Sequence, residues 1–300
     1  MTSPKANLPA SVRQRLLNRA RENNLPFQEL AQRYAIERFL SRLAQSPHAD
    51  RFILKGAQML LVWDSQSSRP TMDIDFLGRT TNTPDHIRTL FQEICALQPP
   101  IPDGIQFHPQ TVTTLTIKED ADYEGVRATF QASLDTVKLR LQIDIGFNDI
   151  ITPGPELVQY PGLLDFPAPT LRAYNRETLI AEKVEAMVKL GLLNSRMKDF
   201  HDIWTLSRSF PFTSRGLHQA LAATFRQRQT EFPQLPSILT AAPADLADKQ
   251  KQWLSFRRKS RLTQSPETFQ TLTADLVTFL QPAMDPNSSP RTWAPPGPWA

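Results

Sequence analysis

The chain has 300 residues, of which 40% are hydrophobic and 21% are charged, and its net charge at pH 7 is only +4. This composition is ordinary for a globular protein that forms one large domain or two modest ones. The single cysteine, Cys95, excludes intramolecular disulfides and any metal site built from several cysteines. No run approaches the roughly 18–20 apolar residues of a membrane span. The charged residues near the N-terminus are not followed by the apolar segment that a signal peptide would have. We therefore expect a cytoplasmic protein with no signal peptide and no membrane partner.

In the N-terminal half, helical and strand patterns alternate. Apolar residues at helical spacing predict helices within residues 11–47, with a break at a Leu-Pro pair. A short apolar run that ends at Gly56 predicts a strand and a turn, followed by a short helix over residues 57–65. The run TMDIDFLG predicts the next strand, Pro84 opens a helix, and three alternating runs between residues 105 and 147 predict further strands.

The C-terminal half is dominated by helical patterns. A proline-punctuated connector, Thr152–Pro169, precedes helical patterns that begin at Thr178 and continue almost to the end. The last residues are rich in Pro and Ser, which predicts a disordered tail. We therefore expect an α+β chain with four parts: an N-terminal helical segment (1–50), an α/β core (51–169), a helical domain (170–282) and the tail (283–300).

Two acidic residues interrupt the apolar run TMDIDFLG. On a strand, Met72, Ile74 and Phe76 would face one side, whereas Asp73 and Asp75 would lie side by side on the other. Like charges at this distance repel each other, and a divalent cation between them would relieve the repulsion. With 30 acidic residues among 300, such a triplet is expected about three times by chance, so its surroundings must decide.

Two further features favour a binding site around this pair. Gly56 forms a small-residue turn between a strand and a helix start, where backbone N–H groups can approach phosphate oxygens; an ordinary tight turn is the alternative. Asp144 lies on a later predicted strand with the same alternation of apolar and acidic residues. It would complete a three-carboxylate site, although a surface acid at a sheet edge is an equal alternative.

The helical half carries a second charged group. Asp199 and Asp202 are spaced i, i+3 on one face of a predicted helix, with Arg196 one turn earlier and Lys183 on the preceding predicted helix. A network of surface salt bridges is the alternative interpretation, because such networks are common on helices.

Taken together, these motifs resemble a known family. A small-residue turn, a helix, Asp-x-Asp on a strand and a third Asp on a later strand resemble the nucleotidyltransferase superfamily of the DNA polymerase β type. The segments ERFLSRL, FILKGAQMLL, RPTMDIDF, LIAEKVEAMV and RMKDFHDIW resemble the AbiEii/AbiGii toxin family and occur in its order, over roughly Ser11 to Pro282. The resemblance implies a nucleotidyltransferase-type mixed β-sheet core with flanking helices, and an all-helical C-terminal domain that completes the cleft.

The resemblance also implies roles for individual residues. Asp73, Asp75 and Asp144 would bind Mg²⁺, or alternatively Mn²⁺, and Lys183 and Asp199 would complete the catalytic set. Ala57 stands where the family usually has a second Gly or a Ser, which removes a hydroxyl contact to phosphate but keeps a small residue. The residues implied to bind the nucleotide are Lys55, Gly56, Ala57, Arg69, Lys183, Arg196, Lys198 and Asp202.

The function implied by the resemblance is that of a toxin from a toxin–antitoxin or abortive-infection system of antiviral defence. Such a toxin transfers a nucleoside monophosphate from an NTP to an acceptor; we expect an RNA acceptor, most plausibly a tRNA end, and a separately encoded antitoxin as partner. The basic stretch Lys249–Arg261 has six basic residues and no acidic one, which suits a polyanion, although a solvated helix face is the alternative. Two alternative functions stay open: a nucleotidyltransferase that modifies a protein or small molecule, and an inactive member of the fold that only binds nucleic acid or a partner.

Overall fold

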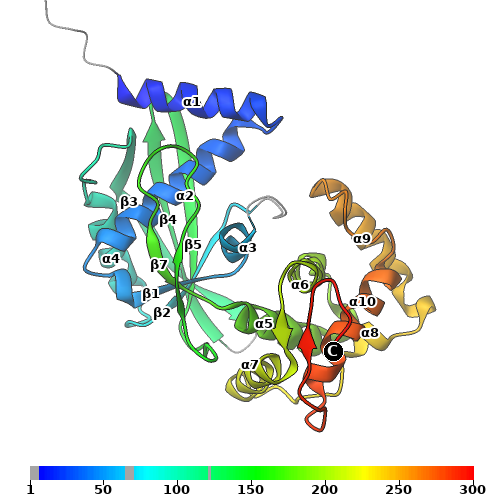
Figure 1. Ribbon diagram of the computed structural model, residues 1–300. Helices are drawn as coiled ribbons and strands as arrows, with labels where there is room; N and C mark the ends of the chain where they lie inside the picture. Colours follow the sequence, from blue (N-terminus) through cyan, green and yellow to red (C-terminus); the bar gives the residue numbers. More distant parts are fainter. Residues whose placement is uncertain (1–6, 65–70, 121–122) are drawn as a thin grey trace, which may run out of the picture. The chain divides into compact units, whose positions relative to one another are not determined.

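In the computed structural model, the residues described are 7–64, 71–120 and 123–300. They form two units (Figure 1). The first unit holds the described residues up to Asn148 together with Glu156–Ala173, and the second holds Asp149–Pro155 and Tyr174–Ala300. The N-terminal helices, expected as a segment of their own, lie in the same unit as the strands of the core. No helix in the described part of the chain is both long and apolar enough to cross a membrane.

The first unit is built on a sheet with flanking helices. Its elements in chain order are α1 (Leu8–Glu22), α2 (Phe27–Gln45), β1 (Phe52–Lys55), α3 (Gln58–Trp63), β2 (Ile74–Gly78), α4 (Pro84–Ala96), β3 (Ile105–Asp120), β4 (Tyr123–Leu134), β5 (Val137–Gly146), β6 (Glu156–Gln159) and β7 (Thr170–Ala173). The seven-stranded sheet has the order β3-β4-β5-β2-β1-β7-β6. It is mixed, since β2 is parallel to β5 and β1 to β7, whereas the other neighbouring pairs are antiparallel.

One face of this sheet is apolar because its strands alternate in polarity. Phe52 of β1, Phe76 of β2 and Phe130 of β4 lie on the face that α2 and α4 cover. There they pack with Phe39 and Phe91 of these helices, with ring centroids between 5.0 and 6.3 Å apart. Burial of each such ring contributes about 1.5–3 kcal/mol. Residues one position further along the strands point to the opposite face, which is therefore available for polar side chains.

The second unit is mainly helical, as expected. Its elements in chain order are α5 (Arg176–Leu190), α6 (Met197–Ser209), β8 (Phe212–Thr213), α7 (Ser214–Gln227), α8 (Ser237–Thr240), α9 (Ala247–Lys259), α10 (Phe269–Met284) and β9 (Thr292–Trp293). The apolar faces of the helices form its core; for example, Phe200 of α6 packs edge-on against Phe269 of α10. The short β8–β9 pair is an addition that the helical pattern does not predict.

The C-terminal tail has a defined fold, which corrects the prediction of disorder over residues 283–300. α10 continues past residue 283, and β9 pairs with β8. Trp293 is buried, its Nε1 donates a hydrogen bond of 2.6 Å to the Ser207 carbonyl oxygen, and its ring packs edge-on against Phe279. Trp299 stacks on the same phenylalanine. Composition does not predict this because two separated tryptophans hold the segment, rather than a periodic apolar pattern.

Candidate active site

Four charged residues, one from each of four neighbouring strands, form a row on the sheet face opposite the phenylalanines. In the register of the sheet, Lys55 of β1 is opposite Asp75 of β2, Asp75 is opposite Asp144 of β5, and Asp144 is opposite Arg127 of β4. Residues that are directly opposite on neighbouring strands share a face. Asp73 immediately precedes β2 and lies two positions before Asp75, so alternation puts it on the same face. The structure thus brings the three predicted carboxylates to one face of the sheet.

The turn after β1 is built against the Asp75 carboxylate. Gly56 has a φ of +70°, a left-handed conformation that residues with a side chain rarely adopt. A Cβ placed on Gly56 would lie 2.0 Å from Oδ2 of Asp75, far closer than van der Waals contact. Only glycine therefore fits here, and its missing side chain lets the backbone of the turn lie next to the acidic residue. Ala57 follows as the N-cap of α3.

The backbone at Asp73 is held by a buried polar pair that sequence analysis missed. Gln58 Nε2 donates a hydrogen bond of 2.8 Å to the Asp73 carbonyl oxygen, and Gln58 Oε1 accepts one of 2.7 Å from the Tyr160 hydroxyl. Both side chains are buried, and burial raises the pKa of Tyr160, so its hydroxyl remains a donor at neutral pH. Gln58 and Tyr160 are 102 positions apart, so no local pattern could reveal the pair.

Asp144 is engaged by a residue that sequence analysis also missed. Arg127 donates from Nε to Oδ1 and from Nη2 to Oδ2 of Asp144, both at 2.7 Å. This bidentate pair raises the pKa of Arg127, and the negative charges of Asp73 and Asp75 raise it further. The sequence pattern that could have indicated Arg127 is the run GVRATF, in which polar and apolar residues alternate as on a strand and Arg127 lies on the polar side.

Within residues 7–64, 71–120 and 123–300, no group of three or more His, Cys, Asp or Glu side chains is arranged to hold a metal ion. The assignment of Asp73, Asp75 and Asp144 as metal ligands stays a prediction.

In the second unit, Lys183 of α5 lies between two aspartates of α6. Its Nζ is 2.7 Å from Oδ1 of Asp199 and 2.8 Å from Oδ2 of Asp202, and all three side chains are buried. Arg196, the N-cap residue of α6, contacts Oδ2 of Asp199 through Nε at 2.7 Å. Buried charges are tolerated only when they are paired, so this cluster fixes a charged lysine in one position.

The burial of Asp199 and Asp202 argues against a network of surface salt bridges at this place. Sequence analysis missed two buried neighbours of the cluster. The Oδ1 of Asn194 accepts a hydrogen bond of 2.8 Å from the Arg196 backbone N–H. His201 places its Nδ1 3.7 Å from Oδ1 of Asp202. Both flank the predicted residues closely in sequence, but neither residue type follows a recognisable spacing.

The other predicted nucleotide-binding residues have different environments. Lys55 is buried at the end of β1, and Lys198 is exposed in the first turn of α6. Arg69 lies outside the described residues. The sheet residues belong to the first unit, and the lysine cluster belongs to the second.

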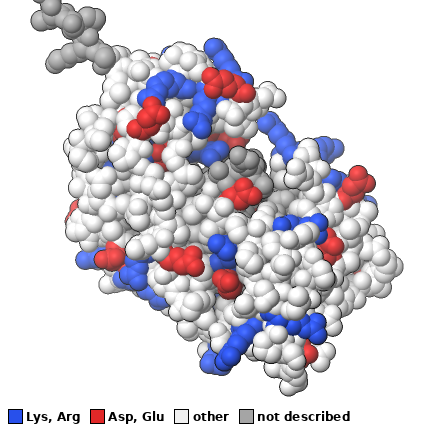
Figure 2. All heavy atoms as spheres, viewed as in Figure 1, with Lys and Arg blue, Asp and Glu red and all other residues white. Residues whose placement is uncertain are grey.

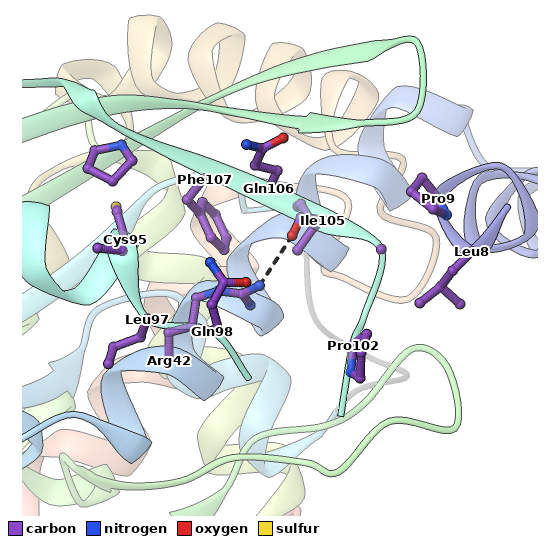
Figure 3. A pocket seen from close by; sticks show the side chains of 13 residues that line it. Leu8, Pro9, Arg42, Cys95, Leu97, Gln98, Pro102, Ile105, Gln106 and Phe107 are labelled. Carbon is purple, nitrogen blue, oxygen red and sulfur yellow. Dashed lines mark hydrogen bonds between the residues drawn. The ribbon is translucent and has the colours of Figure 1, made fainter. Parts of the chain in front are cut away.

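A cavity of about 560 Å³ in the first unit contains none of the predicted site residues (Figure 3). Arg42 points to the Ile105 carbonyl oxygen, to which it donates a hydrogen bond of 3.2 Å, and it also pairs with Asp103. The Cys95 thiol lines the same cavity, and burial raises its pKa to about 12. These polar groups are accounted for by the fold, so we do not place the active site here.

The chain is similar to a known protein family and to solved structures. Residues 38–275 match the family described as "Nucleotidyl transferase AbiEii toxin, Type IV TA system". No curated protein matches the chain. Among solved structures, MenT4, a nucleotidyltransferase toxin from Mycobacterium tuberculosis H37Rv, aligns over 89% of this chain and 86% of its own, with 15% identity and a TM-score of 0.53. JHP933 from Helicobacter pylori aligns over 87% of this chain and 91% of its own, with 15% identity and a TM-score of 0.46.

The likeness to MenT4 supports the fold alone, because the identity is low. The family match is stronger, since it covers most of the chain, including the acidic pair and the lysine cluster. The chain therefore belongs to the AbiEii family, the nucleotidyltransferase toxins of type IV toxin–antitoxin systems.

Proposed function

We propose that this toxin is a metal-dependent nucleotidyltransferase that transfers a nucleoside monophosphate from an NTP to RNA, with a tRNA end as the acceptor. Membership of the family supports the NTP as substrate and implies a cognate antitoxin. The observation that carries the proposal is the close approach of the Gly56 turn to the Asp75 carboxylate. It unites a backbone suited to phosphate with an acidic group suited to a cation.

The donor set of the sheet residues fits a hard divalent cation. Asp73 and Asp75 are carboxylates two positions apart on one face, and carboxylate oxygens are the ligands that Mg²⁺ prefers; Mn²⁺ accepts the same donors. Gln58 holds the backbone of Asp73, and the backbone of the Gly56 turn lies against the Asp75 carboxylate, so the main chain that carries the two carboxylates is held in place. A bound cation would offset negative charge on the phosphate oxygens.

In the proposed reaction, a hydroxyl oxygen of the acceptor attacks the α-phosphorus of the NTP. The bond from this phosphorus to the β-phosphate oxygen breaks, pyrophosphate leaves, and the hydroxyl proton passes to a carboxylate. Lys183 would contribute its ammonium group, which two buried aspartates hold in one position, to binding of the phosphates. Arg196 and Lys198 reach solvent at the start of α6, where their charges can contact phosphate oxygens.

The acceptor proposal rests on the basic end of α9. Arg258, Lys259 and Arg261 are exposed, and Figure 2 shows basic side chains gathered over this end of the helix. Arg257 differs from them because its guanidinium donates hydrogen bonds to the side chain and the backbone of Ser265. A cluster of exposed cations suits the phosphate backbone of RNA, whose binding weakens with salt.

The metal proposal is tested with purified protein, each labelled NTP, Mg²⁺ or Mn²⁺, and total RNA. We expect Asp73→Asn and Asp75→Asn to lose at least about 100-fold in transfer while the protein stays folded, because each change keeps shape but removes a ligand charge. The matched control is Asp85→Asn, an exposed acid at the start of α4, which should be fully active. Full activity of Asp73→Asn or Asp75→Asn with metal present would reject the proposal. Label that appears in protein or a small molecule would favour the alternative acceptor class.

The acceptor proposal has its own test. The triple variant Arg258→Glu/Lys259→Glu/Arg261→Glu should raise the apparent KM for RNA. The KM for RNA should also rise less steeply with salt concentration in the variant than in the wild type. The KM for the NTP should hardly change. The control Arg88→Glu reverses an exposed charge on α4 in the first unit. An equal rise in both KM values would contradict an RNA-binding role for this end of α9, as would no change in either.

A further inference from the structure

The pairing of Arg127 with Asp144 changes what the third carboxylate can do. Both oxygens of Asp144 accept charge-assisted hydrogen bonds of 2.7 Å, one from Nε and one from Nη2 of the same guanidinium. The two residues are directly opposite on β4 and β5, inside the sheet rather than at its edge. Their side chains are 36% and 21% exposed, so the pair is partly shielded from water.

The charges of the row also bear on how many cations it can hold. Asp73, Asp75 and Asp144 carry three negative charges, whereas Lys55 and Arg127 carry two positive ones. The net charge of −1 suits one divalent ion at Asp73 and Asp75. A second dication beside Asp144 would have to replace the guanidinium, because the two cations would repel each other at contact distance.

We propose that Arg127 takes the place of a second cation, so that Asp144 is a positioning residue for Arg127 and not a metal ligand. The inference rests on the proposed function, because it assigns a ligand to the same site. Nη1 is not used in the pair with Asp144, and it would bind a phosphate oxygen of the nucleoside triphosphate. The row would then hold one divalent ion, bound by Asp73 and Asp75, and one fixed guanidinium.

A charge-matched double variant tests this assignment. Arg127→Gln/Asp144→Asn removes one charge of each sign and leaves the net charge of the row unchanged. We expect its affinity for Mn²⁺, measured by electron paramagnetic resonance without nucleotide, to stay within about threefold of the wild type, with a KM for the NTP raised about 10- to 100-fold. Arg127→Gln alone should bind Mn²⁺ more tightly, because Asp144 is then released as a ligand. The metal-site reference is Asp73→Asn, which should lose about tenfold or more in Mn²⁺ affinity.

Three results would overturn the inference. A double variant that loses Mn²⁺ affinity as Asp73→Asn does would make Asp144 a metal ligand. An unchanged KM for the NTP in the double variant would show that Arg127 does not bind the nucleotide. Two Mn²⁺ ions per wild-type chain would also refute the inference. Arg127→Lys is a further variant that keeps the positive charge, and we expect it to show wild-type Mn²⁺ affinity and an intermediate KM for the NTP. If Asp73→Asn leaves Mn²⁺ binding and transfer intact, the proposed function fails instead, and the two failures are thus distinguishable.

Discussion

Replacing Gly56 by alanine should damage both stability and activity. The φ of +70° at this position costs a residue with a Cβ about 1–2 kcal/mol. The new Cβ would also lie 2.0 Å from Oδ2 and 2.7 Å from Cγ of Asp75, so the carboxylate must move. Overpacking of this kind costs about 1–3 kcal/mol more. We therefore expect the free energy of unfolding to fall by about 2–5 kcal/mol, and transfer to fall because Asp75 is displaced.

The assay compares Gly56→Ala in two backgrounds by urea unfolding, followed by circular dichroism. In the Asp75→Ala background most of the clash is absent, although the Asp75 Cβ still lies 2.9 Å from the added atom. The same substitution should then cost mainly the backbone part, about 1–2 kcal/mol. The matched control is Gly154→Ala, since nothing lies within 4 Å of a Cβ at Gly154 and its φ is not positive. The reasoning is refuted if Gly56→Ala costs less than about 0.5 kcal/mol, or costs the same with and without the Asp75 carboxylate.

Three further predictions concern other parts of the structure. Trp293→Ala should lower the free energy of unfolding by about 3–5 kcal/mol, and an unchanged melting temperature would show that the tail does not pack on the helices. Lys183→Met should cost about 3–5 kcal/mol in urea unfolding and abolish transfer, because it leaves buried carboxylates without their shared cation; the exposed control Lys198→Met should leave stability unchanged. Burial raises the pKa of Cys95 to about 12, so the unfolded chain ionises first and stability should decline between about pH 9 and 12, by up to about 1.4 kcal/mol per unit. Cys95→Ala should make this slope shallower, and an identical slope would contradict the burial argument.

The sheet residues were predictable as far as local pattern reaches. The alternation of residues in TMDIDFLG placed Asp73 and Asp75 on one face of the strand and Ile74 on the other. The Gly56 turn was predicted because the preceding strand ends in glycine. Register was not predictable in the same way. That Asp75 is opposite Asp144 depends on β2 and β5 being parallel neighbours, although they are separated by about 70 residues of sequence.

Burial limited the prediction in the helical unit. The i, i+3 spacing of Asp199 and Asp202 is the same for a surface pair and for a buried one, and only the packing of α5 against α6 distinguishes the two. Arg127 was visible as a polar residue on an alternating strand, but its partner lies across the sheet. The prediction of a disordered tail was wrong for a related reason. Trp293 is held by contacts with residues that are far away in the sequence, and composition does not reveal such contacts.

The path of the chain between the two units has a consequence for dividing this protein. The chain passes from one unit to the other after Asn148, after Pro155 and after Ala173. A C-terminal fragment that starts at residue 170 would lack Asp149, which pairs with Arg228 at 2.9 Å, and the short segment that braces the start of α5. Cutting the polypeptide once would thus release neither unit intact. The helical unit is therefore not encoded by one continuous segment of the gene that could be transferred to another protein as a complete domain.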